Sequence, residues 1–173
     1  MKLKLKKDHT KLLKCLCDLP KRIVALQHED HAPEFILHSL CNEDCFNVLR
    51  AAFFVDNPDF NCFKGVAGFS KVEPHAESNY MWQDPIAFLN YMSRSKFNGK
   101  VRDFSRDSIK PGAEKDLESF LTEGLEFTKP EIHVWTLKHD NRGILVFEHE
   151  ANDEWEQEHF LNSLHLLSFC PVS

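Results

Sequence analysis

The sequence lacks the features that mark several large classes of protein. No uninterrupted apolar run approaches the about 18 residues of a membrane span, so we expect no membrane-spanning helix. The basic first residues are not followed by the apolar run of a secretory signal peptide. Glycine is scarce, at 6 of 173 residues, and no glycine-rich phosphate loop with its lysine is present, so nucleotide use has no motif support. No segment repeats at a fixed period of about 20–50 residues, which excludes a solenoid.

What the chain does have is the composition of an ordinary globular domain. Hydrophobic residues make up 42% and charged residues 28% of the sequence, close to the globular average. A chain of 173 residues fits one domain of about 100–200 residues. A chain of this size buries about 70% of the surface that its unfolded form exposes. We therefore predict a single domain over residues 1–173 that needs neither a metal nor a disulfide to fold.

Charge is distributed unevenly along the chain. The net charge of −6 disfavours a nucleic-acid partner. Residues 1–27 carry eight Lys or Arg against two Asp, which gives +6, whereas residues 148–173 carry six Asp or Glu and no Lys or Arg, which gives −6. One interpretation is that these termini are solvated faces or attract each other. The other is a basic arm that docks on an acidic partner.

The six cysteines are expected to be thiols in a reducing cytoplasm. Cys41 and Cys45 have a spacing that structural zinc sites use, but Cys15 and Cys17 are two apart and would face different ways on a helix. Burial as small apolar thiols is the simpler interpretation. No local signature points to a cysteine nucleophile.

Helical spacing dominates the first quarter of the chain. The apolar residues between 12 and 17 predict a helix that ends before Pro20, and those between 23 and 26 predict a second helix with Pro20 in its first turn. A third helix is expected to begin near Pro33. Residues 2–6 alternate Lys and Leu like a short edge strand.

The rest of the sequence predicts two β-hairpins separated and followed by helices. The expected strands are 48–55 and 60–69, then 132–138 and 144–150, and the expected helices begin near Asp84, Leu117 and Asn152. Residues 94–112 are expected to be a loop. This order predicts an α+β fold: an antiparallel sheet built from two hairpins, with helices before, between and after them, packed mainly on one face.

The last hairpin offers a candidate metal site. If residues 140–143 form its loop, His133 faces Glu150 and Trp135 faces Glu148, so that His133, Glu148 and Glu150 share one face. One His and two carboxylates could bind a divalent metal or act as general acid and base. The alternative is a half-solvated outer face with a cross-strand His–Glu contact. A register slip of one residue would separate the three side chains.

The predicted basic loop is a candidate anion-binding site. Its cations alternate with aromatic residues, a combination that could hold a phosphate or an unstacked base. On a solvated connection between two helices, the same residues need no ligand. The candidate anion-binding residues are Arg94, Lys96, Lys100, Arg102 and Arg106.

Aromatic residues are abundant in the first hairpin. The sequence has 15 Phe, and five of them lie in this hairpin: Phe53, Phe54, Phe60, Phe63 and Phe69. Because alternation sends some to each side, either both faces of the sheet are covered or an apolar patch is left for a partner or ligand.

These observations favour a noncatalytic cytoplasmic interaction module. Its expected partner surface is the Phe-rich sheet and the acidic C-terminal helix. One alternative is a metal-dependent hydrolase that uses His133, Glu148 and Glu150, and another is a small-molecule sensor with an aromatic-lined pocket. We expect a protein partner, with a small-molecule ligand or a homodimer as further options, and neither a membrane nor nucleic acid as partner.

Overall fold

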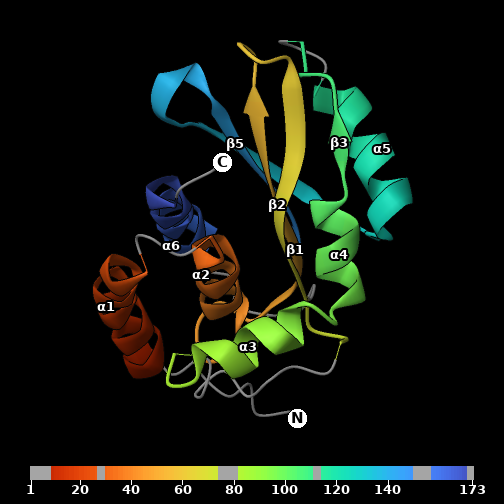
Figure 1. Ribbon diagram of the computed structural model, residues 1–173. Coiled ribbons are helices and arrows are strands. Elements are labelled where there is room, and N and C mark those ends of the chain that lie inside the picture. The colour runs from red at the N-terminus through yellow and green to blue at the C-terminus, as the bar shows by residue number, and fades with distance from the viewer. Residues whose placement is uncertain (1–8, 27–29, 74–81, 111–113, 150–156, 171–173) are drawn as a thin grey trace.

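Five antiparallel strands form one sheet in the computed structural model, which describes residues 9–26, 30–73, 82–110, 114–149 and 157–170 (Figure 1). The spatial order of the strands is β3-β2-β1-β5-β4. Their bounds are Val48–Asn57 (β1), Cys62–Ser70 (β2), Ser105–Arg106 (β3), Glu131–Thr136 (β4) and Arg142–His149 (β5). The two predicted hairpins, β1–β2 and β4–β5, thus pair through β1 and β5 at the centre of the sheet.

Helices cover both faces of this sheet, and more of them lie on one face than on the other (Figure 1). The first face carries α1 (His9–Ala25), α2 (Ala32–Cys41), α3 (Pro85–Met92), α6 (Gln157–Ser163) and the 3-10 helix η2 (Leu164–Phe169). The second face carries α4 (Lys96–Arg102) and α5 (Glu114–Leu125). The predicted α+β class, with helices mainly on one face, is confirmed.

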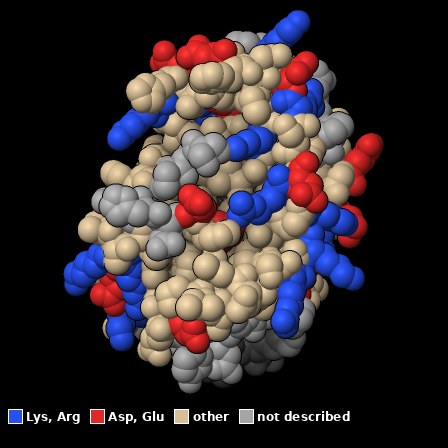
Figure 2. All heavy atoms as spheres, in the orientation of Figure 1, with Lys and Arg blue, Asp and Glu red and all other residues tan. Residues whose placement is uncertain are grey.

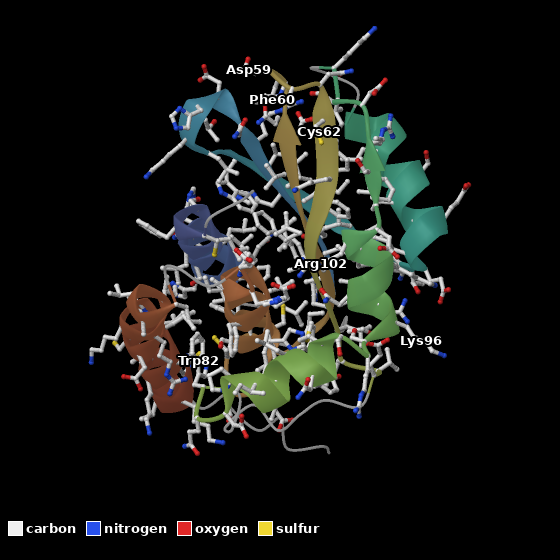
Figure 3. All side chains as sticks on the ribbon, viewed as in Figure 1. Asp59, Phe60, Cys62, Trp82, Lys96 and Arg102 are labelled. Carbon is white, nitrogen blue, oxygen red and sulfur yellow. The ribbon has the colours of Figure 1, made fainter. Side chains whose placement is uncertain are left out.

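The phenylalanines of the first hairpin belong to the core on both faces of the sheet. Phe53 and Phe69 pack in the cluster under α1, α2 and α3, whereas Phe54 and Phe63 pack in the cluster under α4 and α5. Only Phe60 of this set is exposed, and it lies with Asp59 at the hairpin tip (Figure 3). The Phe-rich sheet, which the sequence suggests as a partner surface, is therefore core.

Helix α2 lies between α1 and the sheet (Figure 1). All ten of its residues are buried, so it forms a central layer. Helix α1 covers the outer side of α2 and buries Leu12, Leu19 and Ile23. The first face of the sheet is thus covered by two successive helical layers.

The predicted break at Pro20 is wrong, because α1 is one continuous helix of 17 residues with Pro20 inside it. A proline inside a helix removes one backbone hydrogen bond and usually kinks or ends the helix. Here buried side chains anchor the helix on both sides of the proline, at Leu12 before it and at Ile23 after it. Burial of one continuous face thus overrides the local signal.

The predicted loop over residues 94–112 is also partly wrong, because it contains α4 and β3. Ser95 caps α4, with its hydroxyl accepting a 3.1 Å hydrogen bond from the backbone N–H of Asn98. The helix lies on Gly65 and Gly68 of β2: a Cβ at Gly65 would come within 1.7 Å of the Val101 carbonyl oxygen. The two glycines therefore allow this helix to pack directly against the backbone of β2. The predicted strand over residues 2–6 and the predicted helix start at Asn152 fall outside the described residues.

The predicted register of the last hairpin is wrong. Strand β4 pairs Trp135 with Gly143 and His133 with Leu145. The chain reverses at a 3-10 turn over Lys138–Asp140 rather than at the glycine. Gly143 instead lies against the Trp135 ring, where a Cβ would come within 2.5 Å of the Trp135 Cε2 atom. The Trp135 indole packs directly on Gly143, and the turn forms before this glycine in the chain.

Candidate functional site

The corrected register separates the candidate metal ligands. His133 lies on the same face as its partner Leu145, and its ring stacks on Trp135 at 5.8 Å between centroids. Glu148 follows Phe147 and projects from the opposite face, where it accepts a 3.1 Å hydrogen bond from the backbone N–H of Thr128. Glu150 falls outside the described residues.

The metal hypothesis loses its geometric basis with this separation. In the ranges that the structure describes, no three His, Cys, Asp or Glu side chains gather in a way that could hold a metal ion. Burial, and to a lesser degree the nearby His165, lowers the pKa of His133. This side chain is best explained as an aromatic neighbour of Trp135.

The candidate anion-binding residues spread over several elements. Lys96 and Arg102 lie at opposite ends of α4 (Figure 3), Arg94 is exposed before that helix, and Arg106 lies in β3. Lys96 and Lys100 share a hollow of about 330 Å³.

Carboxylates accompany the cations of that hollow. Lys100 donates a 2.8 Å hydrogen bond to Glu126, and this contact lowers the pKa of the Glu126 carboxyl. Glu73 also lines the hollow and accepts a 2.9 Å hydrogen bond from the backbone N–H of Phe97. Anion binding at Lys96 and Lys100 stays a prediction, with two acidic side chains already beside them.

Arg102 makes a structural ion pair instead. It donates to Glu34 of α2, a residue that is fully buried at 0% exposure. Burial raises the pKa of Glu34, and Arg102 is the main influence that opposes that rise. Helices α2 and α4 cover opposite faces of the sheet. This ion pair therefore links a helix on the first face to a helix on the second face.

The outer side of α1 carries a stripe of exposed apolar residues, which we call the α1 outer face. Its members are Leu13, Cys17, Pro20 and Val24. They are spaced by four, three and four residues, and this spacing places them on one side of a helix. Leu13 is 62% and Val24 is 63% exposed. The inner side of the same helix is already apolar and buried, so α1 has two apolar faces.

Two lysines run along one edge of the α1 outer face. At about 3.6 residues per turn, Lys14 and Lys21 fall on the same side of the stripe. Lys21 lies 3.8 Å from Asp18 and is 81% exposed, whereas Lys14 makes no ion pair with any described residue. Figure 2 shows blue side chains gathered over α1 at the left edge of the molecule. The stripe is therefore apolar with a positively charged edge.

A polar cavity of about 290 Å³ lies beside α1, on the side toward α2. Its walls include Cys15, Arg22, Cys45 and Trp82. The Trp82 indole donates a 3.0 Å hydrogen bond to the Ser39 hydroxyl, and the Arg22 guanidinium lies 5.3 Å from the Trp82 ring centroid. Figure 3 shows Trp82 beside α1.

Cys15 and Cys17 face different ways, as their spacing predicts. Cys15 is half-buried in the cavity wall, whereas Cys17 is exposed on the α1 outer face. Cys41 and Cys45 are buried, and burial raises the pKa of the Cys41 thiol well above its ordinary value. The predicted burial as apolar thiols thus holds for Cys41 and Cys45 but not for Cys17.

The α1 outer face was not predicted, although its residues are visible in the sequence. The apolar residues between 12 and 17 predict a helix that ends before Pro20, and this expected break separates Leu13 from Val24. A search for a second apolar spacing along an uninterrupted helix would have found it. No pattern in the sequence predicts the cavity, because its walls come from segments that are far apart in the chain.

Comparisons add no family to this picture. No protein-family model matches the chain, and no curated protein resembles its sequence at a level that shows relationship. Across the described ranges, no helix combines the length and apolar character required to cross a bilayer.

Proposed function

We propose that the protein is a noncatalytic interaction module that binds an acidic amphipathic helix of a protein partner through the α1 outer face. The observation that carries this proposal is the solvent exposure of the stripe from Leu13 to Val24 on a helix whose other side is already packed. An apolar stripe exposed on a soluble domain is a candidate contact site. Spacing by four and three residues fits a partner helix that presents the same repeat.

Charge favours an acidic occupant over a second copy of the chain. Lys14 and Lys21 border the stripe, and four further lysines precede α1 between residues 2 and 7. Two copies paired through α1 would bring these cations together, which costs free energy. A partner with glutamates beside its apolar stripe would pair with them instead, as the basic-arm interpretation of the sequence expects.

The dimensions of α1 limit how tight this contact can be. At 1.5 Å per residue, its 17 residues span about 25 Å, or between four and five turns. A single helix face of this length buries less than the about 1,200 Å² typical of stable complexes. We therefore expect a reversible contact. The cytoplasmic location belongs to the same proposal and is supported by the six cysteines, none of which forms a disulfide in the structure.

A designed peptide tests the apolar part of the proposal. The probe is a fluorescent synthetic helix with leucines at heptad spacing and glutamates on both flanks, titrated with the full chain and followed by anisotropy. Replacing both Leu13→Ser and Val24→Ser should weaken binding by at least about tenfold, because a few apolar anchors carry most of the energy of such a contact. Both side chains are exposed, so the urea midpoint should not fall.

Ile86→Ser is the matched control, because Ile86 is also apolar and is 72% exposed but lies on α3. It should leave peptide binding unchanged. Equal losses in this control and in the double variant would show that the peptide binds any apolar surface. A dimer that becomes monomeric in the double variant would assign the face to a second copy and overturn the proposal.

A further inference from the structure

Two thiols from distant parts of the chain meet in the cavity beside α1. Cys15 projects from the inner side of α1 and is half-buried, and Cys45 comes from the connection between α2 and β1 and is 1% exposed. Both line the cavity. Cys45 is the neighbour with the largest influence on the Cys15 thiol, and the Cys15 Sγ donates a 3.8 Å hydrogen bond to the carbonyl oxygen of Ser39.

The surroundings lower the pKa of the Cys15 thiol below its ordinary value. The hydrogen bond from Cys45 is the largest influence and lowers the pKa of Cys15, and Arg22 lowers it further. Burial raises that pKa, as do Asp44 and Asp18, and the net direction is downward. A lowered pKa increases the fraction of nucleophilic thiolate.

The acidic residues of the cavity wall are already paired with lysines, which leaves cations on the wall. Lys11 lies 3.0 Å from Asp44, and Lys21 lies 3.8 Å from Asp18. Lys14 lines the cavity without an ion pair to any described residue. Lys14 and Arg22 therefore present positive charge beside the Cys15 thiol.

We propose that Cys15 is a reactive thiol that exchanges with small disulfides bearing carboxylates, and that Cys45 resolves the product into an intramolecular disulfide. In the first step the Cys15 thiolate attacks one sulfur of the small disulfide, forming a mixed disulfide and releasing one small thiolate. In the second step Cys45 loses its proton and attacks the Cys15 sulfur, releasing the second small thiolate. Two protein thiols are oxidised and one small disulfide is reduced to two thiols.

The cavity and its charges set the expected substrate class. A volume of about 290 Å³ is near the lower limit of about 300 Å³ for small-molecule sites, so it fits one half of a small peptide disulfide. Lys14 and Arg22 would attract its carboxylates. Cys15 lies on the side of α1 away from the α1 outer face, so this inference does not depend on the proposed partner.

Peptide mapping after reaction with oxidised glutathione tests the exchange on the full chain. The reduced protein is mixed with the disulfide, quenched with acid at intervals, alkylated and digested. The expected product is a peptide pair joined through Cys15 and Cys45. Cys45→Ser should instead accumulate glutathione on Cys15, and Cys15→Ser should leave the buried Cys45 unmodified. Circular dichroism checks that both variants fold.

Cys17 is the internal reference, because it lies on the same helix and is exposed without these neighbours. Cys15 should react severalfold faster than Cys17. Lys14→Ala should slow the reaction of Cys15 with oxidised glutathione by about threefold and slow its reaction with uncharged hydroxyethyl disulfide by a smaller factor. The inference is overturned if Cys15 reacts no faster than Cys17, or if no Cys15–Cys45 link forms in the wild-type chain.

Discussion

The guanidinium of Arg102 compensates for the burial of the Glu34 carboxyl on α2. Glu34 is fully buried, and its Oε2 atom has no hydrogen-bond partner in the described part of the chain, whereas Oε1 receives Arg102. A buried carboxylate without a cation is costly. Since Arg102 is 43% exposed, solvent shares in the compensation. The pair is best understood as a constraint on how α2 and α4 are arranged, rather than as a source of stability.

Arg102→Met should lower the free energy of unfolding by about 2 kcal/mol. That is less than the about 3–5 kcal/mol lost when a fully buried pair is broken, because water reaches Arg102. Urea denaturation measures the loss. Lys100→Met is the matched control on the same helix, since its partner Glu126 is exposed, and it should leave the urea midpoint unchanged. Equal effects of the two changes would contradict the role given to Glu34.

The raised pKa of Glu34 should make the stability of the protein depend on pH. Burial raises its pKa above the ordinary value of 4.5, so the folded state binds more protons than the unfolded state between these two values. Stability should therefore fall as the pH rises through that interval. Urea midpoints measured from about pH 4 to 7 should show this fall in the wild-type chain and a weaker fall in Glu34→Gln. A Glu34→Gln profile as steep as that of the wild type would assign the dependence to other groups.

At the scale of elements, two strand glycines decide where α4 packs. Helix α4 has only seven residues and contains Gly99, so its own helix-forming tendency is weak. It forms because its Ser95 cap and its contact with β2 stabilise it. Glycine at positions 65 and 68 allows the backbones of helix and strand to approach closely. The position of α4 therefore depends on tertiary packing and not on the helix-forming tendency of its own residues.

Gly65→Ala should destabilise the protein by about 3 kcal/mol, because the added Cβ would overlap the Val101 carbonyl and displace α4. Gly99→Ala is the control within α4: nothing lies within 4 Å of its Cβ position, so better helix propensity should stabilise by about 0.5–1 kcal/mol. Thermal unfolding of both variants makes the comparison. A harmless Gly65→Ala would show that α4 does not rest on β2 as described.

Local signals predicted the elements whose ends are set locally. The hairpin of β1 and β2 follows from its apolar runs around a turn sequence, and α3 follows from Asp84, whose carboxylate accepts a 3.0 Å hydrogen bond from the backbone N–H of Ala87. The misses have tertiary causes. Pro20 stays helical because α1 is buried along one side, and Gly143 lies under Trp135 rather than in the turn. That single shift separated the proposed metal ligands.

At the scale of the whole molecule, the layers explain which apolar residues are available to a partner. Both sheet faces and all of α2 are covered, so the abundant phenylalanine is used in the core. Helix α1 is the outermost layer on its face of the sheet, and it keeps an apolar stripe in solvent beside lysines. The basic first segment of the sequence thus includes both the exposed stripe and the cations that border it.

The most direct test of this account exchanges the charge beside the stripe. The wild-type chain should bind the glutamate-flanked helical peptide at least about tenfold more tightly than the same peptide with lysine flanks, measured by anisotropy at low salt. The double variant Lys14→Glu, Lys21→Glu should reverse this preference while its urea midpoint stays unchanged. If the variant keeps the preference of the wild type, or if neither chain binds either peptide, the α1 outer face is not the docking surface that we propose.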